Sequence, residues 1–205
     1  MMHLGDKLTA YKVLYVGALG GLVFVIMTLI LGTLLNDYSS VSQTVSEIGR
    51  IGSPFQEYYS VMLSLVSILS FIFSCFLFRF ANDNSLSKAP VYCIAFFAVL
   101  DGAFVVFPAP EQLHNVVGLL HIVGYVAPFI VARNWKQYFV HRQLRNYSSV
   151  ASMTIGVMSF LNLSPMIAPK LYPLEFYGIV QRGLLYTYYL WLTWLSITMA
   201  QQKLK

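Results

Sequence analysis

Charged residues are scarce in this sequence. Asp, Glu, Lys and Arg together make up 10% of the chain, whereas 58% of it is hydrophobic and 16% aromatic. Soluble domains carry about 25% charged residues, so these 205 residues lack the polar surface needed to cover a fold in water. The composition excludes an ordinary soluble domain and predicts one integral membrane domain over residues 1–205.

Cysteines and recognisable catalytic signatures are also few. The two cysteines, Cys75 and Cys93, both lie inside apolar segments, where a small buried side chain is the ordinary role and a disulfide framework is excluded. The chain contains no Gly-x-Ser-x-Gly, no phosphate-binding loop and no Cys/His cluster. Nothing in the sequence calls for a metal or a cofactor, and we expect none.

Six apolar stretches are long enough to cross a bilayer, which takes about 20 residues at 1.5 Å each. Between them stand polar residues and prolines, which are typical of turns. The sequence therefore predicts an all-α fold, an integral membrane bundle of six transmembrane helices, at residues 11–35, 58–79, 90–107, 113–132, 149–168 and 176–199.

The lysines and arginines predict the orientation of these spans. Ten fall on one side and three on the other, and the richer side is expected to be cytoplasmic. Both termini are then inside, in a cell membrane (the inner membrane in a bacterium), with membrane lipids as partners. The net charge of +5 is explained by this bias, so no nucleic acid is expected. The ten are Lys7, Lys12, Arg79, Lys88, Arg133, Lys136, Arg142, Arg145, Lys203 and Lys205, and the three are Arg50, Lys170 and Arg182.

Four spans carry a conspicuous polar residue at a similar depth. Each lies seven or eight residues inward from the outer boundary of its span, roughly 10–12 Å below it. Polar groups inside a bilayer are costly and usually face a partner or a watery cavity, so a shared site is predicted. The four residues are Asp101, His121, Asn162 and Arg182.

Each of these residues also has a structural interpretation. Asp101 and Arg182 could form an ion pair that pins two helices, His121 could be a satisfied core histidine, and Asn162 could bond between helices. In the first span, Gly17 and Gly21 have a small-xxx-small spacing, which favours close helix packing.

The loop at residues 41–54 is predicted to cover this site. Thr44 and Glu47 have the spacing of a capping box, so a short helix is expected to begin there and to end at Gly49. Glu47 and Arg50 are then candidates to face the cavity. His114, two helical turns before His121, is expected at its mouth.

Three short motifs resemble a known family. Val-Ser-Glu-Ile-Gly at 45–49 followed by Gly-Ser-Pro at 52–54, Phe-Pro at 107–108 and Gly-Leu-Leu-His at 118–121 are similar to motifs of the domain of unknown function 998 family (DUF 998). The family often has an acidic residue directly after Phe-Pro, whereas this chain has Ala-Pro before Glu111. The resemblance implies a multi-pass membrane protein without an established activity, and it supports Glu47 and His121 as site residues.

Several functions are open to such a chain. His114 and His121 are about 10 Å apart along one helix, too far to share one zinc ion. They also do not face each other from different helices, as a b-type haem would require.

Three kinds of function remain open: a lipid-modifying enzyme that uses acid–base residues, a small proton-coupled transporter, and an accessory or scaffold protein. A transporter of this size would be expected to form a homodimer. The sequence favours an outward-facing polar pocket for an amphipathic or anionic ligand, such as a lipid headgroup, made by Glu47, Arg50, Asp101, His114, His121, Asn162 and Arg182.

Overall fold

The computed structural model describes residues 12–135, 142–167 and 174–201, and within these ranges every regular element is a helix. The predicted all-α fold is therefore confirmed for this part of the chain. The predicted helix ends at residues 11 and 168 lie outside the described residues. So do five of the cations used to predict orientation: Lys7, Lys136, Lys170, Lys203 and Lys205.

Four helical segments are long and apolar enough to cross a membrane, and they match the first four predicted spans. Their mean hydropathy lies between 1.9 and 2.5. They are α2 (Tyr15–Leu34), α4 (Gln56–Asp83), α5 (Ala89–Val106) and the interrupted segment Gln112–Asn134.

The last two long helices, α9 (Arg142–Ile167) and α10 (Tyr177–Ala200), have 26 and 24 residues. They are long enough to cross but more polar than the other four. α9 begins at residue 142 rather than at the predicted 149, because the polar residues that the sequence places before the span are themselves helical. A short 3₁₀ turn at Leu174–Phe176 leads into α10.

The fourth predicted span is not one helix but three. Pro128 lacks an N–H, so the carbonyl of Gly124 loses its usual intrahelical donor, and the helix is interrupted near this point. A second interruption falls at His121, where the N–H of Gly124 bonds the His121 carbonyl at 2.9 Å, with 3₁₀ spacing. The three pieces are α6 (Gln112–Leu120), α7 (Ile122–Tyr125) and α8 (Ala127–Asn134).

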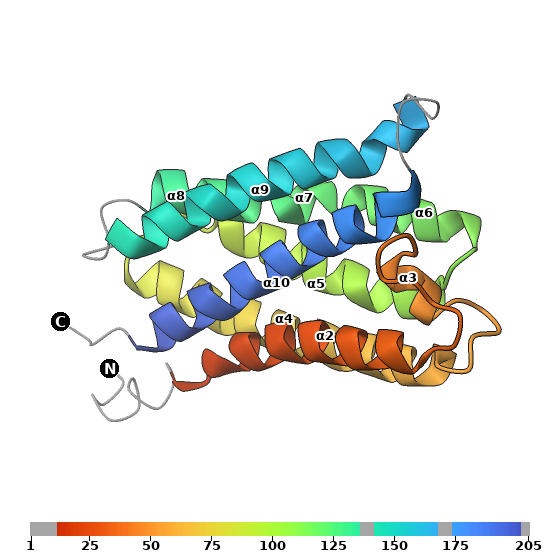
Figure 1. Ribbon diagram of the computed structural model, residues 1–205. Helices are drawn as coiled ribbons and strands as arrows, with labels where there is room; N and C mark the ends of the chain where they lie inside the picture. The colour runs from red at the N-terminus through yellow and green to blue at the C-terminus, as the bar shows by residue number, and fades with distance from the viewer. Residues whose placement is uncertain (1–11, 136–141, 168–173, 202–205) are drawn as a thin grey trace.

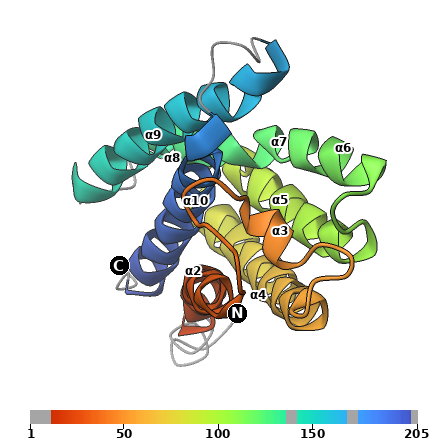
Figure 2. The ribbon, with the colours of Figure 1, turned by 45° about the vertical axis from the view of Figure 1, so that its right-hand side comes forward.

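The helices form an elongated bundle in which α10 runs between α2 and α9 (Figure 1). α2 packs on α4, α4 on α5, and α5 on α6, α7 and α8. Gly17 and Gly21 allow the close approach that the sequence predicts, since a Cβ on Gly17 would collide with Phe73 of α4 and one on Gly21 with Thr193 of α10. At one end of the bundle, α6 and the last turns of α9 diverge in both views (Figures 1 and 2).

The predicted loop helix is present as α3 (Val45–Ile48), with Thr44 and Glu47 forming the capping box and Gly49 as its C-cap. It does not lie apart from the bundle. Val45 and Ile48 are fully buried, so α3 sits on the end at which α6 and α9 diverge. We call this end, over which α3 lies, the α3 end.

Candidate functional site

A cavity of about 510 Å³ lies at the α3 end. α6 and α7, α9, and the first turns of α10 form its walls, and residues of α2, α4 and α5 line it deeper in the bundle. Val116, Leu119 and Ile122 line it and are also exposed, so the cavity opens on an apolar surface. Its lining is mainly aliphatic and aromatic, with polar groups from Ser46, Asp101, His114, Asn115, His121, Ser159, Asn162, Gln181 and the tyrosines Tyr59, Tyr125 and Tyr177.

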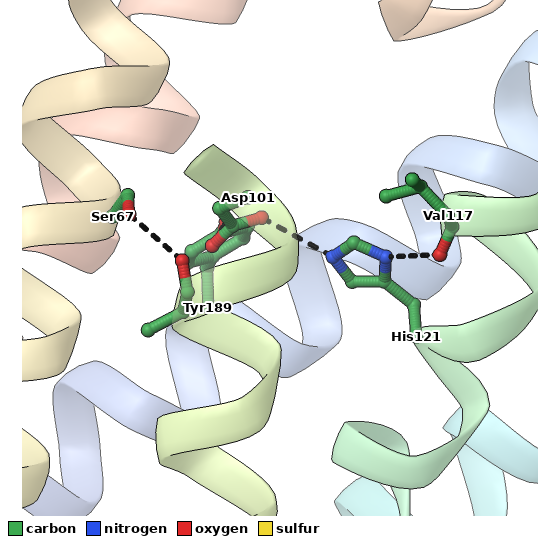
Figure 3. A network of polar contacts seen from close by, with 6 residues as sticks. Ser67, Asp101, Val117, His121 and Tyr189 are labelled. Atoms are coloured by element: carbon green, nitrogen blue, oxygen red, sulfur yellow. Dashed lines mark hydrogen bonds and ion pairs between the residues drawn. The ribbon is translucent and has the colours of Figure 1, made fainter. Parts of the chain in front are cut away.

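Asp101 of α5 and His121, between α6 and α7, form a buried pair in this lining. The Nε2 atom of His121 lies 3.4 Å from Oδ1 of Asp101, and the two residues are 2% and 3% exposed. The other carboxylate oxygen accepts a hydrogen bond of 2.7 Å from the Tyr189 hydroxyl of α10. Figure 3 shows the two side chains pointing toward each other from separate helices. Three helices thus meet in one polar contact, as the common depth of Asp101 and His121 predicts.

Neighbouring contacts hold this pair in place. The His121 ring stacks on Phe104, with centroids 4.9 Å apart, and meets the edge of Phe97 at 4.4 Å. One turn before Asp101, the Ala98 carbonyl accepts a hydrogen bond of 2.8 Å from Ser67 of α4 (Figure 3). The His121 ring is thus held between side chains of α5, and α5 itself is tied to α4 beside Asp101.

The hydrogen bonds also determine how protons are arranged in the pair. Nδ1 of His121 lies 3.0 Å from the Val117 carbonyl, which can only accept, so Nδ1 carries a hydrogen. The contact between Nε2 of His121 and Oδ1 of Asp101 is a hydrogen bond when a second proton lies between these two atoms. On either atom, the pair has no net charge, as either an imidazolium with a carboxylate or an imidazole with a carboxylic acid.

His114 lines the cavity nearer its exposed side, as predicted. Its Nδ1 atom lies 3.0 Å from the Phe107 carbonyl, and its ring lies 4.6 Å from that of Phe104. Since the carbonyl accepts, Nδ1 is the donor, and in the neutral ring Nε2 is left as an acceptor.

Asn162 of α9 lines the opposite wall. Its Oδ1 atom is buried and has no hydrogen-bond partner among the described residues. A buried polar atom without a partner is uncommon in proteins and costs roughly 1–3 kcal/mol. Asn162 is therefore not the interhelical hydrogen-bonding residue of its structural interpretation.

Three of the seven predicted site residues, Glu47, Arg50 and Arg182, do not line the cavity. The Glu47 carboxylate turns back onto its own helix, where Oε1 accepts from the Thr44 N–H at 2.8 Å and Oε2 accepts from Gln43 at 3.0 Å. Arg50 is exposed. From α3, Ser46 reaches the lining instead.

Arg182 also lies outside the lining, and it does not pair with Asp101. Its Nη1 atom donates to the carbonyls of Ser40, Gln43 and Gly178 at 2.8, 2.7 and 3.1 Å, and Nη2 donates to the Tyr38 hydroxyl. Arg182 thus ties the segment before α3 to the first turns of α10.

Tyr38 completes this attachment. Burial raises the pKa of the Tyr38 phenol above its usual value, against the opposing effect of the neighbouring Arg182 charge. The phenol therefore keeps its proton, which it donates to the Thr44 carbonyl at 2.7 Å. The next residue, Val45, donates its N–H to Gln181 of α10 at 2.6 Å.

Two contacts near the cavity, made by Gln181 and Tyr189, were not predicted from the sequence. Gln181 and Tyr189 stand one residue before and seven residues after Arg182, so a polar stripe along the last helix was visible in the sequence. Which of its members face the cavity depends on the rotation of α10, which spacing along one helix does not determine. Among the described residues, no group of three His, Cys, Asp or Glu side chains is placed to hold a metal ion.

Comparison with known proteins gives one finding. No curated protein and no solved structure matches the chain. A family model described as "Protein of unknown function (DUF998)" matches residues 18–198, which include every residue of the cavity lining. The chain therefore belongs to the DUF998 family of proteins of unknown function.

Proposed function

We propose that this DUF998 protein crosses a cell membrane six times, with both termini in the cytoplasm, and binds an amphipathic molecule from the bilayer in the cavity at the α3 end. The single observation that carries the binding proposal is the lining itself. A buried Asp101–His121 pair and the unpartnered side-chain oxygen of Asn162 lie in an otherwise largely apolar cavity that opens on apolar surface. Ligand pockets are typically of this kind, with volumes of about 300–1,000 Å³ and few polar groups.

The six-span count is supported by the dimensions and the packing of the last two helices. With 26 and 24 residues, α9 and α10 exceed the length of about 20 that a crossing needs. α10 packs between α2 and α9, so a bundle that crosses with α2 carries α10 across with it. Some polar side chains of α10, including Arg182 and Tyr189, are buried and so point into the bundle.

Labelling can test this topology. In a chain with Cys75 and Cys93 replaced by serine, Arg50→Cys should react with a membrane-impermeant maleimide added to intact cells. Asp83→Cys, at the other end of α4, should react only after lysis. Reaction of both, or of Asp83→Cys alone, in intact cells would contradict the proposed orientation.

The contacts favour binding over catalysis by His121. Both of its ring nitrogens already have partners, so neither is free to exchange a proton with a substrate unless the Asp101 contact breaks. Neither Arg50 nor Arg182 lines the cavity, so the headgroup contact predicted with these cations is no part of the proposal.

The binding test uses a pair of glycine substitutions. Gly118 lines the cavity, and the nearest atom to an added Cβ is a Phe104 carbon at 3.9 Å, so Gly118→Phe fills the cavity without a backbone collision. Gly156 of α9 has nothing within 4 Å of an added Cβ and is outside the lining, so Gly156→Phe is the matched control.

The measurement is the amphipathic lipid that stays with the detergent-purified protein, quantified by native mass spectrometry and solvent extraction. We expect Gly118→Phe to retain less than one tenth of the bound lipid of the unmodified chain, and Gly156→Phe to retain all of it. Equal retention by both variants, or no bound lipid in any, would overturn the proposal.

Asp101→Asn separates binding from proton-linked roles. An amide can keep both contacts of the carboxyl group, with its oxygen accepting from Tyr189 and its N–H donating to His121, but it has no proton to exchange. Retained lipid in this variant supports a binding protein. Loss of proton-linked uptake in liposomes, or of lipid turnover, with binding intact, would instead indicate a transporter or an enzyme.

A further inference from the structure

We infer that the polar end of the bound molecule is uncharged and carries hydroxyl groups, so that the ligand is a neutral hydroxyl-headed lipid. This inference rests on the proposed function, because it specifies the ligand of the same cavity. It comes from three properties of the lining: its charge, the kind of hydrogen-bonding groups left free, and the place where an acyl chain can leave.

The lining offers no net charge to a ligand. Among the described residues, no lysine or arginine lines the cavity, and Asp101 is its one carboxylate. That carboxylate is balanced by His121 and has both oxygens occupied, one by His121 and one by Tyr189. A charged group moved from water into such surroundings loses its hydration without gaining a counter-ion, so its binding is disfavoured.

An anionic head is disfavoured most clearly. Among the described residues, the two arginines on this side of the bundle do not line the cavity: Arg182 donates to three carbonyls and to Tyr38, and Arg50 is exposed. An anion in the cavity would therefore have no arginine in reach.

The groups that remain free suit a hydroxyl. Asn162 has an unpartnered buried oxygen, and its amide can turn about a soft terminal torsion toward a ligand. On the opposite wall, His114 in its neutral form has Nε2 as an acceptor because Nδ1 donates to the Phe107 carbonyl. These two acceptors can each take a hydrogen bond from a ligand, and an alcohol donates hydrogen bonds without bringing a charge.

The exit for an acyl chain lies between α6 and α9. The lining residues Val116, Leu119 and Ile122 of α6 and α7 are exposed, and the last turns of α9 diverge from α6 (Figure 2). A hydrocarbon chain leaving there would pass from apolar side chains into the hydrocarbon of the bilayer. The head would then lie against Asn162 and His114, on opposite walls of the cavity.

Four probes with one oleoyl or oleyl chain but different heads test the inference: 1-monooleoylglycerol, oleic acid, oleoyl lysophosphatidic acid and oleylamine. Each is titrated against the purified protein in detergent, with displacement of a fluorescent fatty-acyl probe as the readout. We expect monooleoylglycerol to bind at least 10-fold more tightly than any of the three charged probes. Equal or tighter binding of a charged probe would overturn the inference while leaving the cavity as the binding site.

A variant and a further ligand assign the hydroxyl contact to Asn162. Asn162→Leu should weaken monooleoylglycerol binding roughly 3- to 10-fold, the loss expected for one hydrogen bond. It should not weaken binding of methyl oleate, which has no hydroxyl to donate. Asn146→Leu, the same change at an exposed position of the same helix, is the control.

The two failures are distinguishable. If Asn162→Leu leaves monooleoylglycerol binding unchanged, or weakens methyl oleate equally, the hydroxyl contact is wrong. If no probe binds and Gly118→Phe changes nothing, the proposed function itself fails. Circular dichroism and gel filtration of each variant show whether a lost signal reflects unfolding, and in that case Asn162→Ala, which also removes the amide, replaces Asn162→Leu with the same expected results.

Discussion

The two ends of the bundle use their polar side chains differently. At the end where α2 begins and α10 ends, polar groups bond helix to helix: Trp191 donates to Ser148 at 3.0 Å, and Ser196 accepts from the Ala18 N–H at 2.8 Å. At the α3 end, the cavity remains between the helices, and Asn162 faces it without a partner. The cavity, together with the unpartnered oxygen in its lining, is the physical basis for placing a ligand at the α3 end.

The packed end should depend most strongly on single large side chains. Trp191 is fully buried and hydrogen-bonded, whereas Trp194, on the same helix, is 41% exposed. Trp191→Ala leaves a cavity and strands the Ser148 hydroxyl, and we expect a loss of about 3–5 kcal/mol in unfolding free energy. Trp194→Ala should lose less than about 1 kcal/mol. Thermal unfolding in detergent measures both, and equal losses would break the contrast between the buried and exposed faces.

A smaller and more local effect is expected where α3 is attached to α10. Arg182→Met removes four donated hydrogen bonds from a charged group, each worth about 1.5–3 kcal/mol when its partner has no substitute. Water can replace part of this for carbonyls near the surface, so we expect a net loss of about 2–4 kcal/mol, concentrated in the segment before α3.

Limited proteolysis and hydrogen exchange of residues 36–53 would detect this loosening. Arg50→Met, which removes an exposed cation from the same region, is the control and should leave both unchanged. Unchanged protection in Arg182→Met would show that the segment is held by Val45, Ile48 and the α3 capping box without the arginine.

The smallest effect has the opposite sign. Asn162→Leu replaces a buried amide that has no partner for its oxygen, so without ligand it should leave the protein equally stable or more stable by up to about 1 kcal/mol. Thermal unfolding of lipid-stripped protein is the measurement. A clear loss of stability would mean that Asn162 has a structural partner in solution, and the contrast between the two ends would weaken.

The sequence predicts how deep a residue lies along a helix, but it does not predict which direction the residue faces around the helix axis. The number of residues from a boundary sets depth at 1.5 Å per residue, and Asp101, His121 and Asn162 do reach one cavity as that count predicts. Arg182 lies at the same depth but on a different side of its helix. Each residue turns the helix by about 100°, so Gln181, Leu184 and Leu185 line the cavity while Arg182 faces the segment before α3.

Local chemistry was predictable where the partners are neighbours in the chain. The capping box of α3 needs only Thr44 and Glu47 three residues apart, and it forms as expected. The same contact explains why Glu47 is absent from the cavity: a carboxylate that satisfies the first turn of its own helix has its oxygens occupied. The sequence predicted the capping box, but it did not show that forming this box would occupy the carboxylate of Glu47, a predicted site residue.

The sequence by itself determined the apolar helices, their approximate ends, the short helix after the first of them, and the depth of the polar residues. These follow from composition, turn residues and the fixed rise of a helix, all of which are local. Only the tertiary structure decided that Asp101 meets His121 and Tyr189, that Arg182 bonds loop carbonyls, that the fourth segment is interrupted at His121, and that Asn162 remains unpaired. Those outcomes depend on how each helix is rotated and tilted against its neighbours, which is set by the packing of the whole bundle at once.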